Sequence, residues 1–486
     1  MGRDSARITL HKRGTRVNHR FQGVESASEL IHSFNNPIVY FDPDIDGVIS
    51  GLLVCRYLSK IGKPFRWYIN SNRSHDWTLP LNQPSKVDVI AVDFMISPSL
   101  LEKLCKGNYN IVSMDHHVNA PEYISCSTNS NRGIIINNQY TSEPEDSRYL
   151  SGAGVVFETL IQIDPTFDTE ENRALVGITL LSDIREIENP LAEDYLYTLY
   201  THKYKGYIKY LFDATVGKDF DFGAPRVDRN FVDFKLSPAI NSCLRFNQQD
   251  MVVNFMLGRC DLDTSYRGMQ QDLVNAILEK LSVVTLPHLK VAYFYETDFM
   301  EYSDILSSFV GLVASRLLDG EHSVICYVIS TTDRGNYVKR ASFRGCINGL
   351  DYNGASKEYF TCLGHKSAFG IKGIKPSKDL FLALSKVYGR LEKDSNYKRT
   401  VIGVSNLAFY TNKALKIAEN NCYLLSQNKV YLEYLGNSIE NKRSGDKYRE
   451  YWVDGISVMS FDPEKTPSNS YIVPMLSRGY LIYTLE

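Results

Sequence analysis

Aspartates recur at every second position of one short segment, Asp42-Pro43-Asp44-Ile45-Asp46-Gly47. The segment directly follows Ile38-Val39-Tyr40-Phe41, an apolar run that predicts a short buried strand. Hard divalent cations prefer oxygen ligands, so these carboxylates could hold a metal ion. Taken alone, the segment could equally be a turn or a helix cap.

Two more polar groups follow predicted strands. Asp93 comes at the end of the strand-like run from Val87 to Val92, and Asp115-His116-His117 follows the run from Asn110 to Met114. Helical spacing of apolar residues after the first strand indicates a crossover helix, so the strands should be parallel. The carboxyl ends of parallel strands open onto one edge of the sheet, where ligands bind. We therefore expect these side chains to converge in one crevice.

A fourth acidic position, Asp183, follows a helical pattern from Ala174 to Leu181. So many carboxylates in one crevice would repel one another unless cations offset their charge. Carboxylate and imidazole ligands together suit Mn²⁺ or Mg²⁺ better than thiolate-binding metals. Two such ions about 3.5–4 Å apart could share a bridging carboxylate and hold a phosphate for in-line displacement.

The elements that position these residues predict an α/β fold in several domains. Strand-like and helix-like segments alternate in the first half and again after residue 289, with a mainly helical stretch between them. Tyr-rich strand-like runs end the chain. The predicted parts are a basic N-terminal arm at 1–35, a parallel-sheet domain at 36–197, a helical linker at 198–285, a second α/β domain at 286–395 and a small β-rich domain at 396–486.

The composition is that of an ordinary soluble protein, with 43% hydrophobic and 23% charged residues. A net charge of −2 does not indicate general nucleic-acid binding, so any such binding must use a local patch. No apolar run approaches the roughly 18 residues that span a bilayer. The N-terminus lacks the apolar core of a secretory signal, and the nine cysteines form no Cys-x-x-Cys pair. We expect no membrane association, a cytoplasmic location and reduced cysteines.

The motifs together resemble the DHH phosphoesterase superfamily, and within it the RecJ-like single-strand exonucleases. Asp42-x-Asp44-x-Asp46-Gly47 is similar to the first motif and Val92-Asp93 to the second. Asp115-His116-His117 is the motif that names the superfamily. Ser151-Gly152-Ala153-Gly154-Val155 resembles the helix start that follows, and Asp183 stands where the fourth motif has its acid. The parallel-sheet domain is therefore expected to be a DHH catalytic domain.

Further motifs in the second half favour the RecJ-like branch. Ser237-Pro238-Ala239-Ile240-Asn241-Ser242-x-x-Arg245 is similar to its Pro-Arg-Ile-Asn-Ala-Ala-Gly-Arg stretch, and Gly311-Leu312-Val313-Ala314-Ser315-Arg316-Leu317 to one of its helices. Ser342-x-Arg344 and Leu363-Gly364-His365-Lys366-Ser367-Ala368-Phe369-Gly370 resemble the accessory DHHA1 domain. The second α/β domain is therefore expected to be DHHA1-like, and the resemblance covers roughly residues 36–375. RecJ-like proteins often also carry an oligonucleotide-binding (OB) fold, which the β-rich end of the chain would provide.

The resemblance implies a role for each matched residue. One Mn²⁺ or Mg²⁺ would be held by Asp44 and Asp93 with Asp42 beside it, and a second by Asp46, Asp93, His116 and Asp183, so that Asp93 bridges two ions. Asp115 would orient a histidine, and His117 would face the phosphate or the leaving group. Substrate phosphates would be bound by Asn241, Arg245, Ser342, Arg344, Gly364 and His365.

The sequence departs from the family pattern at four places. Tyr40 replaces the histidine that opens the first motif in many relatives, which would weaken binding of the first ion. Ile305-Leu306-Ser307-Ser308 replaces an expected Trp-His-Pro-Gly, which removes one substrate contact. Ala239 replaces an arginine, and Cys362-Leu363 stands where glycines are usual, which affects the approach of the backbone to phosphate.

Three functions fit these motifs. The first is a 5′-to-3′ exonuclease on single-stranded DNA that uses two divalent ions, because the linker and later domains could hold a long strand. The second is the same chemistry on short or cyclic substrates, as in nanoRNases and cyclic-dinucleotide phosphodiesterases. The third is an inactive replication or repair scaffold, which the retained acids oppose. Single-stranded nucleic acid is the expected partner, with replication or repair proteins as further candidates.

Overall fold

The structure is a computed structural model. The structure describes residues 21–70, 77–117, 122–128, 131–182, 190–201, 206–216, 231–332, 335–347, 350–364, 366–394, 401–404, 431–436, 438–445, 448–453, 456–460, 465–468, 470, 472–477 and 480–485. They divide into two compact units, the first made of residues up to 69, 79–238 and from 399 onward, and the second of residues 70–78 and 239–398. Among the described residues, no helix is long and apolar enough to cross a membrane.

The first unit contains a six-stranded sheet, sheet A, in the order β2-β1-β3-β4-β6-β5. Its neighbouring strands are parallel except β5, which pairs antiparallel with β6. The carboxyl ends of β1, β3, β4 and β6 therefore share one edge. The strands are β1 (Ile38–Phe41), β2 (Arg66–Ile69), β3 (Val87–Val92), β4 (Tyr109–Asp115), β5 (Ile124–Thr128) and β6 (Asn131–Asn137).

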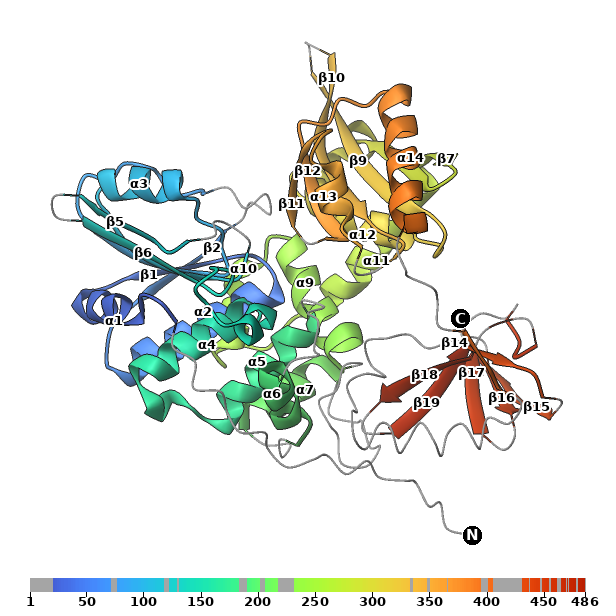
Figure 1. The fold of residues 1–486 in the computed structure, drawn as a ribbon, viewed down its shortest axis with the longest axis horizontal. Helices are drawn as coiled ribbons and strands as arrows, with labels where there is room; N and C mark the ends of the chain where they lie inside the picture. Colours follow the sequence, from blue (N-terminus) through green and yellow to red (C-terminus); the bar gives the residue numbers. More distant parts are fainter. Residues whose placement is uncertain are drawn as a thin grey trace, which may run out of the picture. The chain divides into compact units, whose positions relative to one another are not determined.

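Helices cover both faces of sheet A. Figure 1 shows α3 on one face and α1, α2 and α4 on the other. The two inner strands β3 and β4 are almost wholly buried, as a parallel sheet covered on both faces requires. The helices are α1 (Val24–Ser33), α2 (Ile45–Lys60), α3 (Pro98–Lys106), α4 (Gly152–Ile163), α5 (Glu170–Ser182), α6 (Pro190–Thr201) and α7 (Gly206–Val216), with 3₁₀ turns at Glu145–Tyr149 and Pro165–Phe167 and a π turn at Val232–Leu236.

Part of the segment predicted to be a basic arm belongs to this core. Helix α1 buries Val24, Ala27, Leu30 and Ile31, and it contacts α4, β4 and β6. The apolar residues at helical spacing explain why it packs there rather than lying in solvent.

The second unit is built on sheet B, in the order β11-β12-β10-β9-β8-β7. All its neighbouring strands are antiparallel except β8 and β9. Strand β7 begins within the segment 198–285 that the sequence predicts to be a helical linker, and that prediction is wrong for residues 282–285. The strands are β7 (Ser282–Leu286), β8 (Leu289–Tyr295), β9 (Ser323–Thr332), β10 (Gly335–Arg344), β11 (Thr361–Gly364) and β12 (Ala368–Lys372).

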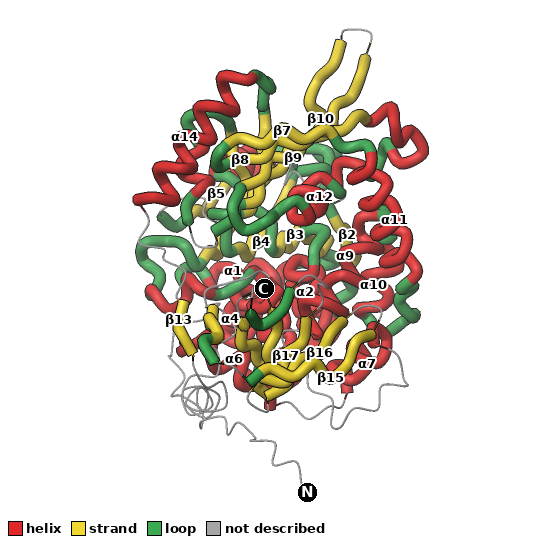
Figure 2. Tube along the Cα trace, turned by 90° about the vertical axis from the view of Figure 1, so that its right-hand side faces the viewer, coloured by secondary structure: helices red, strands yellow, loops and turns green. Residues whose placement is uncertain are grey.

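Two apolar cores lie on the two faces of sheet B. One face packs on α11 and α12 through residues such as Val313, Val324 and Cys326. The other packs on α14 through residues such as Ile325, Phe343 and Leu384. Figure 2 shows α12 and α14 on opposite sides of β8 and β9. The helices are α9 (Ser237–Arg245), α10 (Gln249–Met256), α11 (Ser265–Glu279), α12 (Val310–Arg316), α13 (Tyr352–Ser356) and α14 (Lys378–Asp394), with 3₁₀ turns at Glu296–Tyr302 and Leu306–Ser308.

The C-terminal part is a seven-stranded sheet in the order β13-β14-β18-β19-β17-β16-β15. This agrees with the β-rich composition expected there. The strands are β13 (Val401–Val404), β14 (Tyr431–Tyr434), β15 (Ile439–Gly445), β16 (Tyr448–Val453), β17 (Ile456–Ser460), β18 (Ile472–Ser477) and β19 (Tyr480–Leu485).

Candidate metal centre

The Asp-rich segment turns from β1 into α2. Asp44 is the N-cap of α2, and its Oδ1 accepts a hydrogen bond from the backbone N–H of Gly47 at 2.9 Å. A helix cap, one of the two explanations of the segment taken alone, therefore holds for Asp44. The turn is tight, because a Cβ on Gly47 would lie 2.4 Å from the carbonyl oxygen of Asp42. Asp42 itself is buried.

Asp46, in the first turn of α2, is bound by the N-terminus of α4. Its Oδ2 accepts a hydrogen bond from the N–H of Gly152 at 2.7 Å, and its Oδ1 accepts one from Ala153 at 2.9 Å. Backbone N–H groups at a helix start have no partner within the helix, and the helix dipole favours an anion there. The small residues of this helix start thus hold an acid of the first motif in place.

Asp93 directly follows β3 and has a φ of 50°, which is uncommon for a residue other than glycine. Its N–H donates to the carbonyl of Met114 at 3.0 Å, which ties this turn to β4. Its carboxylate lies against the start of α4, because a Cβ on Gly152 would be 2.5 Å from Oδ1 of Asp93. The glycine at this position therefore leaves the space that the carboxylate occupies.

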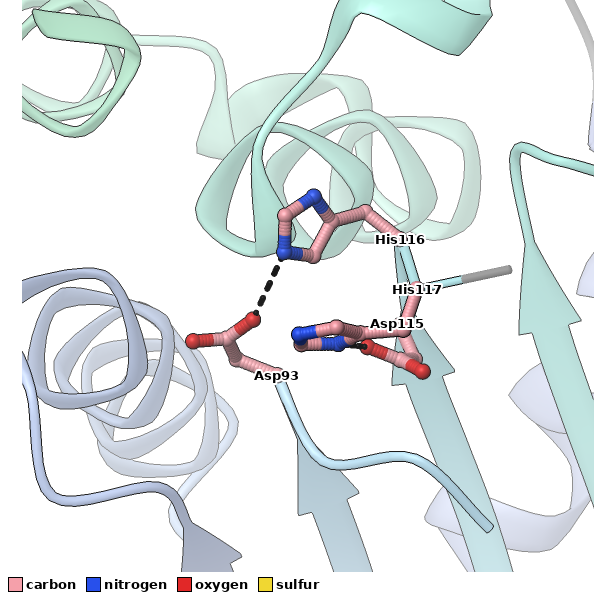
Figure 3. Close-up of side chains that lie close together, drawn as sticks. All are labelled: Asp93, Asp115, His116 and His117. Carbon is pink, nitrogen blue, oxygen red and sulfur yellow. Dashed lines mark hydrogen bonds and ion pairs between the residues drawn. The ribbon is translucent and has the colours of Figure 1, made fainter. Parts of the chain in front are cut away.

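The Asp-His-His motif ends β4 and brings two imidazoles to Asp93 (Figure 3). Nε2 of His116 is 3.1 Å from Oδ1 of Asp93 and 3.9 Å from Oδ2 of Asp46. Nδ1 of His117 is 2.7 Å from Oδ1 of Asp115, which fixes the plane of that ring. One ligand atom from each of Asp93, Asp115, His116 and His117 lies within 4.8 Å of the other three.

Within this cluster, the surroundings disfavour the charged form of Asp93 but favour that of Asp115. Burial raises the pKa of Asp93 well above its ordinary value, and the nearby carboxylates of Asp46, Asp44, Asp115 and Asp42 raise it further. Burial also acts to raise the pKa of Asp115, but His117 and His116 lower it by more, so its net pKa is below the ordinary value. Several carboxylates therefore lie in a buried place where burial and mutual repulsion disfavour their charged form, and a bound cation would offset this effect.

The residues fit a divalent cation. The donor set is oxygen and imidazole nitrogen, which suits Mn²⁺ or Mg²⁺. Oδ2 of Asp115 is buried and accepts no hydrogen bond from the described residues. A cation among these groups would offset the repulsion that raises the pKa of Asp93.

Two predicted site residues lie outside the described residues. Asp183 follows the last described residue of α5, and His365 follows β11. Their predicted roles in metal and phosphate binding therefore stay predictions.

In the second unit, Arg344 lies at the end of β10 beside α12. Its Nε donates to Oγ of Ser315 at 3.2 Å, and its Nη1 donates to Oγ of Ser342 at 3.0 Å and to the carbonyl of Phe343 at 2.7 Å. Burial lowers the pKa of Arg344 to about 10. A Cβ on Gly311 would lie 2.6 Å from Nη2, so this glycine makes room for the guanidinium. These partners are neutral, which leaves the positive charge available to an anion.

Gly364 ends β11 with a φ of +133°, a conformation that L side chains rarely adopt. Its carbonyl accepts a hydrogen bond from Nδ2 of Asn353 at 3.0 Å. The glycine therefore sets the course of the chain just before His365.

Two predicted phosphate-binding residues, Asn241 and Arg245, lie on α9. Arg245 donates from Nη1 to Oε1 of Gln270 at 2.8 Å and from Nε to the carbonyl of Ser308 at 3.3 Å. Oδ1 of Asn241 is buried and accepts no hydrogen bond from the described residues. Arg245 thus links α9 to α11 and to the 3₁₀ turn before α12.

One residue of the edge was not predicted. Asn137 ends β6, and its Nδ2 donates to the carbonyl of His117 at 2.8 Å. The same signal that singled out Asp93, a polar residue at the end of an apolar strand, would have found Asn137.

Tyr40, where many relatives have histidine, is buried and stacks on Tyr68 with 5.4 Å between ring centroids.

Comparison with known proteins gives a family and a fold. Residues 38–182 match the DHH family, N-terminal domain. The chain is 22% identical over 427 residues to YorK of Bacillus subtilis (strain 168), provisionally named an SPbeta prophage-derived single-strand DNA-specific exonuclease. That match covers 79% of this chain and 71% of the relative. RecJ from Thermus thermophilus in complex with Mn²⁺ has a TM-score of 0.62 and 16% identity, over 99% of this chain and 72% of that chain. In complex with Mg²⁺, the same protein gives a TM-score of 0.60 and 16% identity, over 99% of this chain and 70% of that chain.

Residues 38–182 therefore form a DHH-family N-terminal domain, and the chain has a RecJ-like α/β fold. The DHH assignment made from the motifs is confirmed for residues 38–182, and the RecJ-like assignment is confirmed at the level of the fold. The family match and the carboxylate–imidazole cluster support a phosphoesterase that hydrolyses phosphoester bonds and binds divalent metal.

Proposed function

We propose that this protein is an exonuclease that degrades single-stranded DNA from the 5′ end with two divalent ions. The observation that carries the proposal is the convergence of Asp93, Asp115, His116 and His117 at the carboxyl edge of sheet A. The provisional name of the YorK relative supports the choice of single-stranded DNA as substrate. The RecJ-like fold of the chain agrees with that choice.

Two ions would be held by the acidic and imidazole side chains that the motifs single out. Asp44 and Asp93 would bind one ion with Asp42 beside it, and Asp46, Asp93, His116 and Asp183 would bind the other. The ions would supply Lewis acidity, which polarises the phosphodiester and stabilises the charge that develops during displacement.

The protein side chains would orient the substrate and move a proton. Asp115 accepts a hydrogen bond from Nδ1 of His117, so Nε2 is the ring atom that would face the leaving oxygen. In its doubly protonated form, the ring would donate the Nε2 proton to that oxygen. His117 suits this role because its side chain is 19% exposed, whereas that of His116 is only 2% exposed. In the second unit, the Arg344 guanidinium would bind a substrate phosphate, with Ser342 fixing its orientation.

The test is hydrolysis of end-labelled single-stranded DNA in Mn²⁺, alongside a dinucleotide and a cyclic dinucleotide, with Asp93→Ala as the inactive control. Release of mononucleotides from the labelled 5′ end, lost in the variant, is the expected result. Cleavage of only the short or cyclic substrates would overturn the exonuclease and indicate a nanoRNase or cyclic-dinucleotide phosphodiesterase. Absence of any metal-dependent turnover would indicate a scaffold for replication or repair proteins.

A further inference from the structure

One face of β10 carries a row of polar side chains that extends beyond Arg344. Alternation along the strand and pairing with β9 place Arg340, Ser342 and Arg344 on the same face, opposite Val328, Cys326 and Val324. That is the face on which α12 packs. Two arginines thus point to one side of the sheet, four residues apart.

The neighbouring strand β12 adds a third basic side chain, Lys372, and two small residues, Ala368 and Gly370. Ser342 pairs with Gly370, and Arg344 pairs with Ala368, so small residues flank the row on this side. Lys372 lies two residues beyond Gly370, so alternation places it on the same face, next to Arg340. Side chains this small leave room beside the basic groups, and Arg340 and Lys372 are each half-buried.

The two strands that carry these cations contribute no acidic side chain of their own. Strands β10 and β12 contain neither aspartate nor glutamate. The buried Glu296 lies on this side of the sheet, where it accepts a hydrogen bond from Ser330 and forms an ion pair with Lys339, whose Nζ also donates to the carbonyl of Ser303 at 2.9 Å. The charge of Glu296 is therefore used to compensate Lys339 within the fold. The net charge that the two strands bring to this face is positive.

The spacing of the row decides what kind of anion can use it. In an antiparallel strand, residues four apart are separated by about 14 Å. Phosphates of a stacked strand follow one another at roughly 3.4 Å along its axis, so the row spans about four steps of a stacked strand and fewer of an extended one. A dinucleotide has only one linking phosphate, so a phosphate at Arg340 in addition to one at Arg344 requires a longer strand.

We propose that Arg340 and Lys372 form a second phosphate-binding position on this face, occupied only by substrates longer than a dinucleotide. This inference rests on the proposed function, because it takes Arg344 to bind a phosphate of the strand that is degraded. Arg340 and Lys372 then determine the preference for long strands over short ones.

The test measures binding of a fluorescein-labelled twenty-nucleotide oligothymidylate to the full chain in Mn²⁺, with Asp93→Asn in every variant so that the strand stays intact. Arg340→Gln and Lys372→Gln are each expected to weaken binding on the order of tenfold. Each should also reduce the slope of log affinity against log salt by about 0.7, the value for one lost phosphate contact on a single strand. Arg340→Lys should keep the wild-type slope, which a merely structural role of Arg340 would not predict.

Lys386→Gln is the matched control, since Lys386 is exposed on α14, which packs on the opposite face of sheet B. Lys386→Gln should bind the strand like the parent protein.

In protein that keeps Asp93, the ratio of turnover on the twenty-nucleotide strand to turnover on a dinucleotide should fall for Arg340→Gln and stay unchanged for Lys386→Gln. A parent protein that binds the strand but never degrades it would refute the proposed function and leave the binding comparison valid. Affinity and salt slope of Arg340→Gln and Lys372→Gln equal to those of the parent would overturn the second phosphate position.

Discussion

At the scale of single residues, Asp93 is the side chain of the candidate site whose charged form is most strongly disfavoured. It is buried, four other aspartates raise its pKa further, and its Oδ1 faces the imidazole of His116. A carboxylate in such a place makes the metal-free protein less stable than an uncharged isostere would. The same carboxylate is the one that we expect to give the site its affinity for a divalent cation.

Replacing this charge should separate stability from metal binding. Without metal, Asp93→Asn is expected to unfold at the same temperature as the wild type or higher, because the like-charge repulsion is relieved. At a Mn²⁺ concentration of about 100 times the dissociation constant, the wild type should gain about 2.7 kcal/mol and the variant much less. Thermal unfolding in EDTA and in Mn²⁺ measures both effects.

Asp298→Asn is the control for this comparison, since Asp298 is exposed in the second unit. It should gain the full stabilisation by Mn²⁺. An Asp93→Asn protein that Mn²⁺ stabilises as strongly as the wild type would show that Asp93 is not a metal ligand.

At the scale of elements, the N-terminus of α4 organises the site. Its first two N–H groups bind Asp46, its first residue packs against Asp93, and Oγ of its N-cap Ser151 accepts from the N–H of Gly154 at 3.3 Å. One helix start thus fixes acids from two different motifs. This explains why small residues occupy it.

The packing of α4 on Asp93 predicts the effect of a single methyl group. In Gly152→Ala, the new Cβ would overlap the Asp93 carboxylate, which must move. We expect Mn²⁺ affinity to fall on the order of tenfold or more, as when a group that orients a metal ligand is disturbed. Isothermal titration with Mn²⁺ measures this loss.

Gly268→Ala is the matched control, because a Cβ at this position of α11 meets open space. It should keep its metal affinity and gain about 0.5–1 kcal/mol of stability, as alanine gains over glycine within a helix. Equal Mn²⁺ affinity in the two alanine variants would argue against the contact between Gly152 and Asp93.

Asp46 should behave differently from Asp93, although both are buried acids. Both oxygens of Asp46 accept hydrogen bonds from backbone N–H groups, so the amide of Asp46→Asn would turn a donor toward a donor. We expect a loss of about 1–3 kcal/mol of stability even in EDTA. Urea unfolding of the two asparagine variants compares them directly, and an Asp46→Asn protein as stable as the wild type in EDTA would contradict this account of α4.

At the scale of the whole molecule, each of the two compact units has its own buried apolar residues, and buried cysteines are among them in both. Cys55 and Cys105 are buried in the first unit, and Cys243 and Cys326 are buried in the second. Burial raises the pKa of Cys243 to about 11, and it raises the pKa of Cys326 still further. These thiols are therefore packing groups, as expected for reduced cysteines without a metal-binding spacing.

The burial of these cysteines predicts the order in which they react. In the native protein, iodoacetamide should modify the exposed Cys260 first and leave Cys243 and Cys326 unmodified, since only the thiolate is nucleophilic. In urea, all should react. Peptide mass mapping after timed alkylation measures this order, and early modification of Cys326 would show that the second unit opens readily in the native state.

The sequence by itself determined the fold class and the gathering of the acids at one edge. Strand β3 begins and ends where the apolar run from Val87 to Val92 does, and Asp93 follows it. These features depend on local patterns, such as alternating or continuous apolar runs and the rule that parallel strands share a carboxyl edge. For that reason they can be read without knowing what packs against what.

Only the tertiary structure decided the contacts between residues far apart in the chain. Asp46 and Gly152 are 106 positions apart, and their hydrogen bond depends on how α2 and α4 pack on sheet A. The same holds for Arg245, whose partners come from α11 and the turn before α12. It also holds for β7, which is a strand because it pairs with β8. Such contacts follow from the packing of whole elements and leave no periodic signal in the sequence.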